Sequence, residues 1–129
     1  MAKTKQFTIA INHQPGAVAE IVKTLGNAKV NILALLGTSQ GGAGIVQLVA
    51  DDARRAKKAL DAARIAYQET PAESYDLANK PGALAQCLEK LALRGINLNS
   101  IYATAAKGGR TAVVVYTVDT VARAATATA

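Results

Sequence analysis

The sequence predicts an α+β protein built from two similar units in tandem. The first observation is an internal repeat, because residues 15–36 return as residues 81–102, 66 positions later. Its closest match is Pro-Gly-Ala-Val-Ala at 15–19 against Pro-Gly-Ala-Leu-Ala at 81–85. The second observation is that apolar residues in both copies recur first with the period of a strand and then with that of a helix. A repeat of this length indicates a duplicated structural unit.

The first unit begins with a strand and a helix. Residues 7–11 alternate between apolar and small or polar side chains, which is typical of a half-buried strand. After a turn at 12–16, apolar side chains in residues 18–25 recur at the spacing i, i+3, i+4 and i+7 of an amphipathic helix. We expect Gly26-Asn27 to end this helix, because glycine and asparagine favour the positions just after a helix.

A β-hairpin and a second helix follow. Residues 30–36 and 45–50 are apolar segments joined by a glycine-rich turn at 41–44, which predicts two paired strands. Asp51-Asp52 is then expected to begin a helix that runs to about Arg64, since acidic side chains stabilise the positive end of the helix dipole.

A short strand over residues 65–70 closes the first unit. The resulting order β-α-β-β-α-β is the ferredoxin-like, or split βαβ, arrangement. We therefore place the first unit at residues 1–70 and the second at residues 71–129, with Pro71-Ala72 as a short linker between them.

The second unit repeats the same order but is expected to be truncated after its second helix. That helix should begin at Asp119, and we expect no fourth strand after it. The sheet edge left by the missing strand needs cover from the neighbouring unit or from a partner chain. The other expected elements are strands at 74–79, 97–103 and 110–117, and a helix at 81–94 that ends at Arg94-Gly95.

Composition and charge exclude several classes of protein. Half of the residues are apolar, yet no run is long enough for a secretory signal or a membrane span. The single cysteine allows no internal disulfide, so we expect a cytoplasmic protein with no membrane partner. The net charge of +6 is spread along the chain, and its one dense stretch at 54–58 is interpreted as the solvated face of a helix. We do not expect nucleic-acid binding, because no aromatic platform accompanies these charges.

Residues suited to catalysis or metal binding are scarce. One histidine and one cysteine cannot form a metal cluster or supply the usual Cys–His pair at a suitable spacing. Cys87 lies on the apolar stripe of its helix, where we interpret it as part of the core. The glycines at 41–44 lack the lysine and the following helix of a phosphate-binding loop. We therefore expect a non-catalytic protein without a metal or a cofactor.

The duplicated loop between the first strand and the first helix is the candidate binding site. Residues 12–16 and 78–82 lead into a helix whose first N–H groups have no partner within the helix, so a carboxylate or another small anion has a seat there. Asparagine side chains in or near these loops add groups that both donate and accept hydrogen bonds. Pro-Gly turns and asparagine caps also occur in proteins that bind nothing, so a plain structural turn stays open as the alternative.

Two motifs resemble those of the ACT domain, a regulatory module that commonly senses amino acids in metabolic enzymes. They are Asn-Lys-Pro-Gly-Ala-Leu at 79–84 and, after a helix, Arg-Gly-Ile-Asn-Leu at 94–98, followed by a strand hairpin. The resemblance covers nearly the whole chain, twice, and it implies a βαββαβ ferredoxin-like fold for each unit. The first copy departs from the pattern in two places, since His13 replaces the usual asparagine or aspartate and Lys29 stands where Gly95 stands in the second copy.

The resemblance also implies where a ligand binds. In the family, ligands usually lie between two ACT units, held by the strand–helix loop of one unit and the helix or strand of its neighbour. Carried over to this chain, the second site comprises Asn79, Gly82, Ala83, Leu84, Asn97 and Leu98, and the first comprises His13, Gly16, Ala17, Val18, Asn31 and Ile32.

The sequence therefore resembles the small stand-alone tandem ACT proteins, and we expect a module that binds an amino acid. It would report that ligand through homodimer formation or through a partner that is a metabolic enzyme or a regulator. Two alternatives stay open. A purely structural interaction module would bind only protein, whereas an RNA-binding protein of the same shape would need exposed aromatic side chains on its sheet. Tyr102 and Tyr116 are the candidates for that role.

Overall fold

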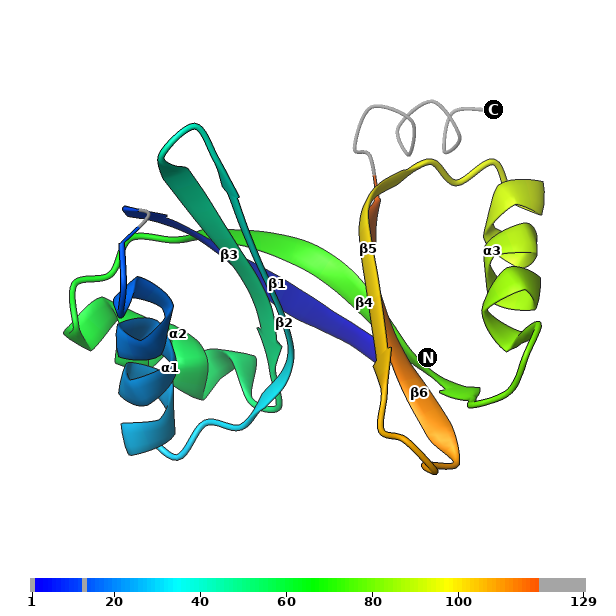
Figure 1. The fold of residues 1–129 in the computed structure, drawn as a ribbon, viewed down its shortest axis with the longest axis horizontal. Coiled ribbons are helices and arrows are strands. Elements are labelled where there is room, and N and C mark those ends of the chain that lie inside the picture. Colours follow the sequence, from blue (N-terminus) through cyan, green and yellow to red (C-terminus); the bar gives the residue numbers. More distant parts are fainter. Residues whose placement is uncertain (1, 13, 119–129) are drawn as a thin grey trace. The chain divides into compact units, whose positions relative to one another are not determined.

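The computed structural model describes residues 2–12 and 14–118, and Figure 1 shows its helices and strands. Two compact units make up the chain. The N-terminal unit is Thr4–Pro71, and the C-terminal unit runs from Ala72 and also includes the first residues up to Lys3. The elements are β1 (Ala2–Asn12), α1 (Ala17–Asn27), β2 (Ile32–Gln40), β3 (Ala43–Ala50), α2 (Ala53–Ala62), β4 (Gln68–Ala78), α3 (Ala83–Leu93), β5 (Leu98–Ala105) and β6 (Thr111–Val118).

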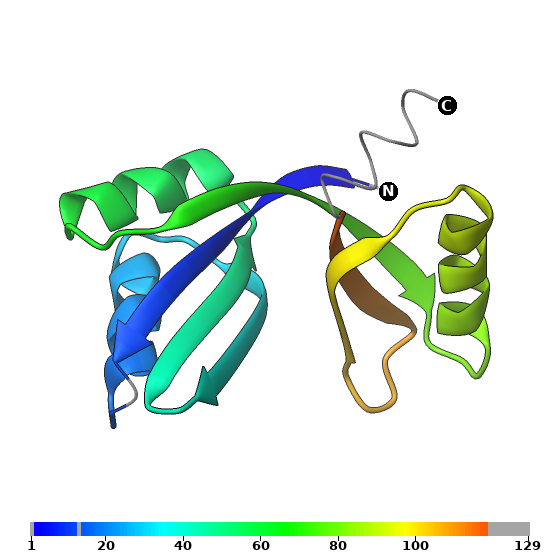
Figure 2. The ribbon, with the colours of Figure 1, turned by 90° about the horizontal axis from the view of Figure 1, so that it is seen from above.

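The N-terminal unit has the predicted order β-α-β-β-α-β. Its strands lie in the order β2-β3-β1, with the start of β4 on the other side of β1. Figure 2 shows α1 and α2 on the same face of these strands. The core lies between the two layers and includes Phe7, Ile9, Ile21, Leu25, Val46, Leu48, Ala56 and Leu60, all of them buried.

The C-terminal unit contains β4, β6 and β5 in that order, and both pairs are antiparallel. Ala2 and Lys3, at the start of β1, belong to this unit, and β1 is the neighbour of β4 in the strand order. Leu91 of α3 is buried, as are Val114 and Tyr116 of β6. The helix predicted to begin at Asp119 lies outside the described residues.

The sequence repeat is also a structural repeat, down to its irregularities. The ladder between β2 and β3 shifts its register between Ile32 and Ala34. The ladder between β5 and β6 shifts between Leu98 and Ser100, 66 positions later. A register shift at the same place in both hairpins shows that the two units share their detailed geometry. The helices and strands of the two units confirm the predicted α+β class.

Both hairpin turns lie at the predicted glycines, but the first is shorter than the expected 41–44, because Ala43 and Gly44 belong to β3. Gln40 pairs with Ala43, and the two residues between them, Gly41 and Gly42, both have positive φ angles of 59° and 86°. A two-residue turn with two positive φ angles suits the twist of paired strands and strongly favours glycine. In the second hairpin Gly108 has a φ of 77°, so the corresponding glycines also form the turn.

Pro71-Ala72, predicted as a linker between the units, does not interrupt the sheet, because residues of the two expected strands at 65–70 and 74–79 form one continuous strand, β4. A proline cannot donate a hydrogen bond to a neighbouring strand. Pro71 is tolerated here because it is exposed and precedes Glu73, where the described pairing of β4 with β6 begins. The strand therefore passes from one unit to the other without a loop.

The first helix ends at Asn27, within the predicted Gly26-Asn27, but neither of these residues takes the left-handed conformation that follows the helix. Both residues belong to α1, and the chain leaves the helix at Ala28 and Lys29, of which Lys29 has a φ of 66°. In the second copy the predicted end is confirmed, since Gly95 takes the left-handed conformation with a φ of 73°. Lys29 adopts a conformation that glycine tolerates at much lower cost, so the geometry of the duplicated unit outweighs the local preference.

Candidate functional site

The loop that leads into each N-terminal helix has the same backbone structure in both units. In the loop 78–83, the N–H of Lys80 donates to the carbonyl of Ala78 at 2.9 Å, and the N–H of Ala83 donates to the carbonyl of Lys80 at 3.3 Å. The loop 12–17 contains the two equivalent bonds at the same lengths. The duplicated Pro-Gly motif therefore forms the same two backbone hydrogen bonds in both units.

Glycine is required at the helix start by backbone conformation and not by space. Gly16 and Gly82 precede α1 and α3 with φ angles of 86° and 88°, and no side chain caps either helix. A Cβ atom built at either glycine meets nothing within 4 Å. The space in front of each helix start is therefore open in the described part of each unit.

The open end of α3 presents unpaired donors. The N–H groups of Gly82, Leu84 and Ala85 have no acceptor among the described residues. Such groups, together with the positive end of the helix dipole, favour a carboxylate or another anion. The C-terminal unit therefore has free N–H donors at the predicted anion-binding position.

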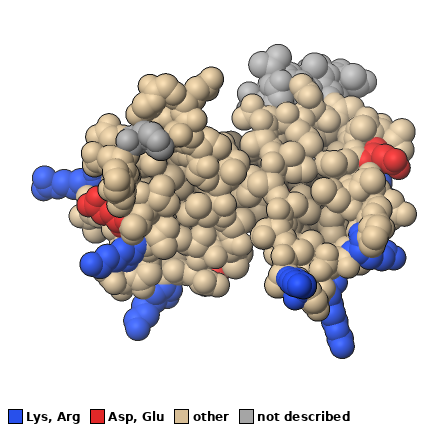
Figure 3. Space-filling model, viewed as in Figure 1, with Lys and Arg blue, Asp and Glu red and all other residues tan. Residues whose placement is uncertain are grey.

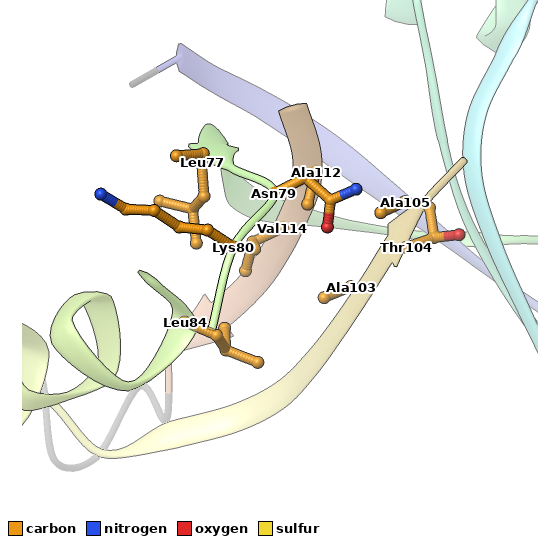
Figure 4. A pocket seen from close by; sticks show the side chains of 10 residues that line it. Leu77, Asn79, Lys80, Leu84, Ala103, Thr104, Ala105, Ala112 and Val114 are labelled. Atoms are coloured by element: carbon orange, nitrogen blue, oxygen red, sulfur yellow. The ribbon is translucent and has the colours of Figure 1, made fainter. Parts of the chain in front are cut away.

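A hollow of about 240 Å³ lies next to this helix start, between the loop, α3 and the ends of β5 and β6 (Figure 4). Its walls are mainly apolar and include Leu77, Leu84, Ala103 and Val114. Its polar lining residues are Asn79, Lys80 and Thr104, and Figure 4 shows the carboxamide of Asn79 extending toward the ends of β5 and β6. The volume lies below the range of roughly 300–1,000 Å³ that is common for drug-sized ligands, so the hollow suits a small molecule.

Asn79 also has a structural role that its sequence position does not reveal. Its Nδ2 donates to the carbonyl of Gly109 at 2.9 Å, and its backbone N–H donates to the carbonyl of Arg110 at 2.9 Å. These bonds tie the loop to the β5–β6 turn and hold the carboxamide in place. The side-chain oxygen of Asn79 remains as an acceptor toward a ligand.

Asn97 and Leu98, the other residues predicted for this site, lie at the opposite end of α3. They precede or begin β5, after the helix has ended at Arg94-Gly95. Since α3 has 11 residues and an α-helix rises about 1.5 Å per residue, its length separates them from the loop. Within the unit, the structure therefore brings Asn79, Gly82 and Leu84 together but leaves Asn97 and Leu98 apart.

The N-terminal unit shows the same division. Gly16, Ala17 and Val18 lie at the start of α1, whereas Asn31 and Ile32 follow its end. Ile32 is half-buried and packs against the core. The sixth predicted residue, His13, lies outside the residues that the structure describes.

Asp51 fixes the position of Asn31 and does not cap α2, which corrects the prediction that both acids begin that helix. The carboxylate of Asp51 accepts the N–H of Asn31 at 3.0 Å, and the N–H of Asp51 donates to the carbonyl of Asn31 at 2.9 Å. Asp52 alone is the N-cap, since its carboxylate accepts the N–H of Arg55 at 3.0 Å.

A buried polar cluster in the C-terminal unit was not predicted. The phenol of Tyr116 donates to the carboxylate of Glu73, the hydroxyls of Tyr75 and Tyr116 lie 3.3 Å apart, and the two rings are stacked at 5.7 Å. Burial, and then the hydrogen bond to Glu73, raise the pKa of Tyr116 well above its usual range. The available signal was Glu73 itself, an acid at the position that Phe7 occupies in the first copy.

Tyr116 does not have the exposure that RNA binding through the sheet would need, because only 1% of its surface is accessible. Tyr102 is half-buried, and burial raises its pKa to about 12.

Arg55 and Lys57 of α2 form ion pairs with Asp52 and Glu69 at 3.8 Å and 3.6 Å. Figure 3 shows Lys and Arg side chains spread over the face in view, as expected for solvated surface charge.

Cys87 differs from its predicted role in the core. It is half-buried, whereas Ile21 at the matching position of α1 is 4% exposed.

No group of three or more histidine, cysteine, aspartate or glutamate residues in the described ranges could hold a metal ion. None of the described helices is long and apolar enough to cross a membrane.

Comparison with known proteins identifies the family of this chain. The sequence matches the ACT domain pair family over residues 1–128, so the chain belongs to that family. No curated protein matches the sequence significantly.

Two solved structures show how widely the fold is shared. Protein BT0572 from Bacteroides thetaiotaomicron is 27% identical with a TM-score of 0.80, over 91% of this chain and 80% of that one. The regulatory subunit of aspartate kinase from Thermus thermophilus, in a ligand-free form, is 18% identical with a TM-score of 0.66, over 89% of this chain and 82% of that one. The ACT resemblance inferred from the two motifs is therefore confirmed.

Proposed function

We propose that this protein is a non-catalytic regulatory module that binds a small amino acid at the start of α3. The observation that carries the proposal is the pairing of unpaired helix N–H groups with an adjacent small hollow edged by Asn79. Membership of the ACT domain pair family supports a regulatory role. The fold that the chain shares with a regulatory subunit of aspartate kinase is consistent with it.

Each part of an amino acid has a matching group at this site. The α-carboxylate accepts hydrogen bonds from the N–H groups of Gly82 and Leu84. The side-chain oxygen of Asn79 accepts from the α-ammonium. A small apolar side chain enters the hollow, where it contacts Leu77 and Val114. The limited volume favours small apolar amino acids over aromatic ones.

We further propose that binding is reported through assembly, either as a homodimer or with a metabolic enzyme or regulator. Asn97 and Leu98, and in the first copy Asn31 and Ile32, are then available to a ligand held by the loop of a neighbouring unit. A ligand that bridges two units stabilises the arrangement that brings them together. The first loop, which contains His13, Gly16, Ala17 and Val18, is proposed as a second site of the same kind.

Thermal denaturation of the purified protein with each of the twenty amino acids tests the proposal. A ligand that binds only the folded state raises the melting temperature as its concentration exceeds the dissociation constant. We expect one or two small apolar amino acids to do so. If none does at millimolar concentration, the purely structural interaction module becomes the better account.

A matched pair of glycine variants tests the location. Gly82→Leu places a side chain in front of the α3 N–H groups and should weaken binding at least tenfold. Gly42→Leu is the control, because Gly42 has a similar φ of 86° and equally open surroundings in the hairpin turn of the N-terminal unit. Equal affinity of the two variants, measured by calorimetry, would show that the loop is not the binding site.

A further inference from the structure

A second hollow in the C-terminal unit, with a volume of about 500 Å³, runs along the opposite flank of the loop, between α3 and β4. Its β4 wall includes Tyr75, Asp76 and Leu77, and Lys80 lies at the loop end. The hollow continues to the last turn of α3, well beyond the proposed amino-acid site. The helix side of the hollow is formed by Ala83, Gln86, Cys87, Lys90 and Leu91 of α3 and by Arg94, the residue that caps its C-terminal end.

The two copies of the unit differ sharply along this face of the helix. In the N-terminal unit the matching residues Ile21 and Leu25 are buried in an apolar core with Leu60 of α2. In the C-terminal unit Cys87 replaces Ile21 and Tyr75 replaces Ile9, so that groups able to form hydrogen bonds replace aliphatic ones. The hydroxyl of Tyr75 is in turn close to that of Tyr116, which is bonded to Glu73.

The residues that line this hollow are more positively charged in the second copy than at the matching positions of the first copy. At five lining positions the formal charge changes from −1 in the first copy to +2 in the second. In the part of the chain that the structure describes, Lys80, Lys90 and Arg94 have no acidic partner within 4.0 Å. The five positions are Ala10, Gln14, Glu20, Thr24 and Ala28 in the first copy, and Asp76, Lys80, Gln86, Lys90 and Arg94 in the second.

From these observations we infer that the hollow between α3 and β4 binds a small polyanion, with two or more negative charges on a compact body. Lys90 and Arg94 lie four residues apart on one face of α3 and so reach the same ligand. Arginine favours planar, bidentate recognition of phosphate or carboxylate, and lysine adds a mobile point charge. The class therefore comprises phosphorylated metabolites and polycarboxylates, which share this chemistry.

The test is a titration of the full chain with pyrophosphate and, separately, with citrate. Isothermal calorimetry at low ionic strength should give saturable binding of at least one of them. Binding of pyrophosphate alone identifies a phosphate-bearing ligand, and binding of citrate alone identifies a polycarboxylate. If neither anion binds saturably at millimolar concentration, the inference is overturned.

Variants taken from the repeat itself make the test specific. The double variant Lys90→Thr, Arg94→Ala inserts the residues of the first copy, which α1 accommodates, and should weaken binding at least tenfold. The control Lys23→Thr, Lys58→Ala removes two exposed cations from the N-terminal unit and should bind within twofold of the unmodified chain. Equal weakening in both double variants would indicate only a general charge effect and would refute a site.

Amide chemical shifts provide a readout that does not depend on any variant. On addition of the anion, the largest changes should fall on the amides of α3 between Gln86 and Arg94. Changes centred on the N-terminal unit instead would place the anion elsewhere and overturn the proposal. Lys80 lines both hollows, but Lys90 and Arg94 line only this one, so failure of the test on these two residues would leave the proposed function standing.

Discussion

Two residues account for much of the difference between the cores of the two units. Phe7 and Leu48 are fully buried in the N-terminal unit, and the matching residues of the C-terminal unit are Glu73 and Tyr116. Glu73 and Tyr116 are cross-strand partners, so a single hydrogen bond satisfies the phenol while it lies in the core. A buried polar group without its partner costs about 1–3 kcal/mol, so the two substitutions depend on each other.

The raised pKa of Tyr116 predicts how stability depends on pH. An unfolded tyrosine loses its proton near pH 10, whereas burial and the hydrogen bond to Glu73 keep the folded phenol protonated to higher pH. Above pH 10 the unfolded state therefore binds fewer protons than the folded state, and the free energy of unfolding falls as pH rises. In the variant Tyr116→Phe this phenol no longer titrates, so the fall in the free energy of unfolding with pH should be smaller by the equivalent of up to one proton. Denaturant unfolding between pH 9 and pH 11 measures this slope. An unchanged slope in the variant would show that the phenol of Tyr116 is not held protonated by the fold.

At the level of elements, the strands and helices could be predicted because their signals are local. The alternation in residues 7–11 and the glycines at 41–44 depend only on near neighbours, and the structure has a strand and a turn there. The continuity of β4 through Pro71 could not be predicted, because it depends on which strand lies beside each residue. The same reason explains why Lys29 keeps a left-handed conformation.

The candidate site divides in a similar way. The turn at Gly82 was visible in the sequence, since a positive φ before a helix is a local requirement. The bond from Asn79 to Gly109 was not, because it depends on the length of a hairpin 30 residues further along the chain. The distance of Asn97 from the loop follows from the length of α3 and was not apparent from the motifs alone.

A glycine in β3 tests how closely the first hairpin packs on its neighbour. A Cβ atom built at Gly44 lies 2.8 Å from Cγ1 of Ile11, and this atom is not at the free end of its side chain. Gly44→Ala should therefore lower the free energy of unfolding by about 1–3 kcal/mol through overpacking. Gly37→Ala, in β2, is the control, since a Cβ atom there meets nothing within 4 Å. Chemical denaturation of both variants decides the matter, and equal stability would mean that Ile11 relaxes freely.

For the whole molecule, duplication places two copies of the same loop in one chain, and the copies have diverged at positions of the proposed sites. The second copy keeps Asn79 and Gly95, whereas the first has His13 and Lys29 at those places. The cationic positions of the second hollow are likewise absent from the first copy. This divergence is consistent with one unit that binds ligands more strongly and one whose first role is structural.

If the ligand bridges units of two chains, ligand binding and homodimer formation must strengthen each other by the same factor. The amino acid identified by thermal denaturation should then shift the monomer–dimer equilibrium toward the dimer, as measured by sedimentation at several protein concentrations. We expect a change of roughly 5–150-fold in the dimer dissociation constant, the usual range of such coupling. Gly82→Leu should abolish the shift, whereas Gly42→Leu should retain it. A dimer whose dissociation constant is the same with and without saturating ligand would rule out homodimer formation as the reporter and leave a partner protein in that role.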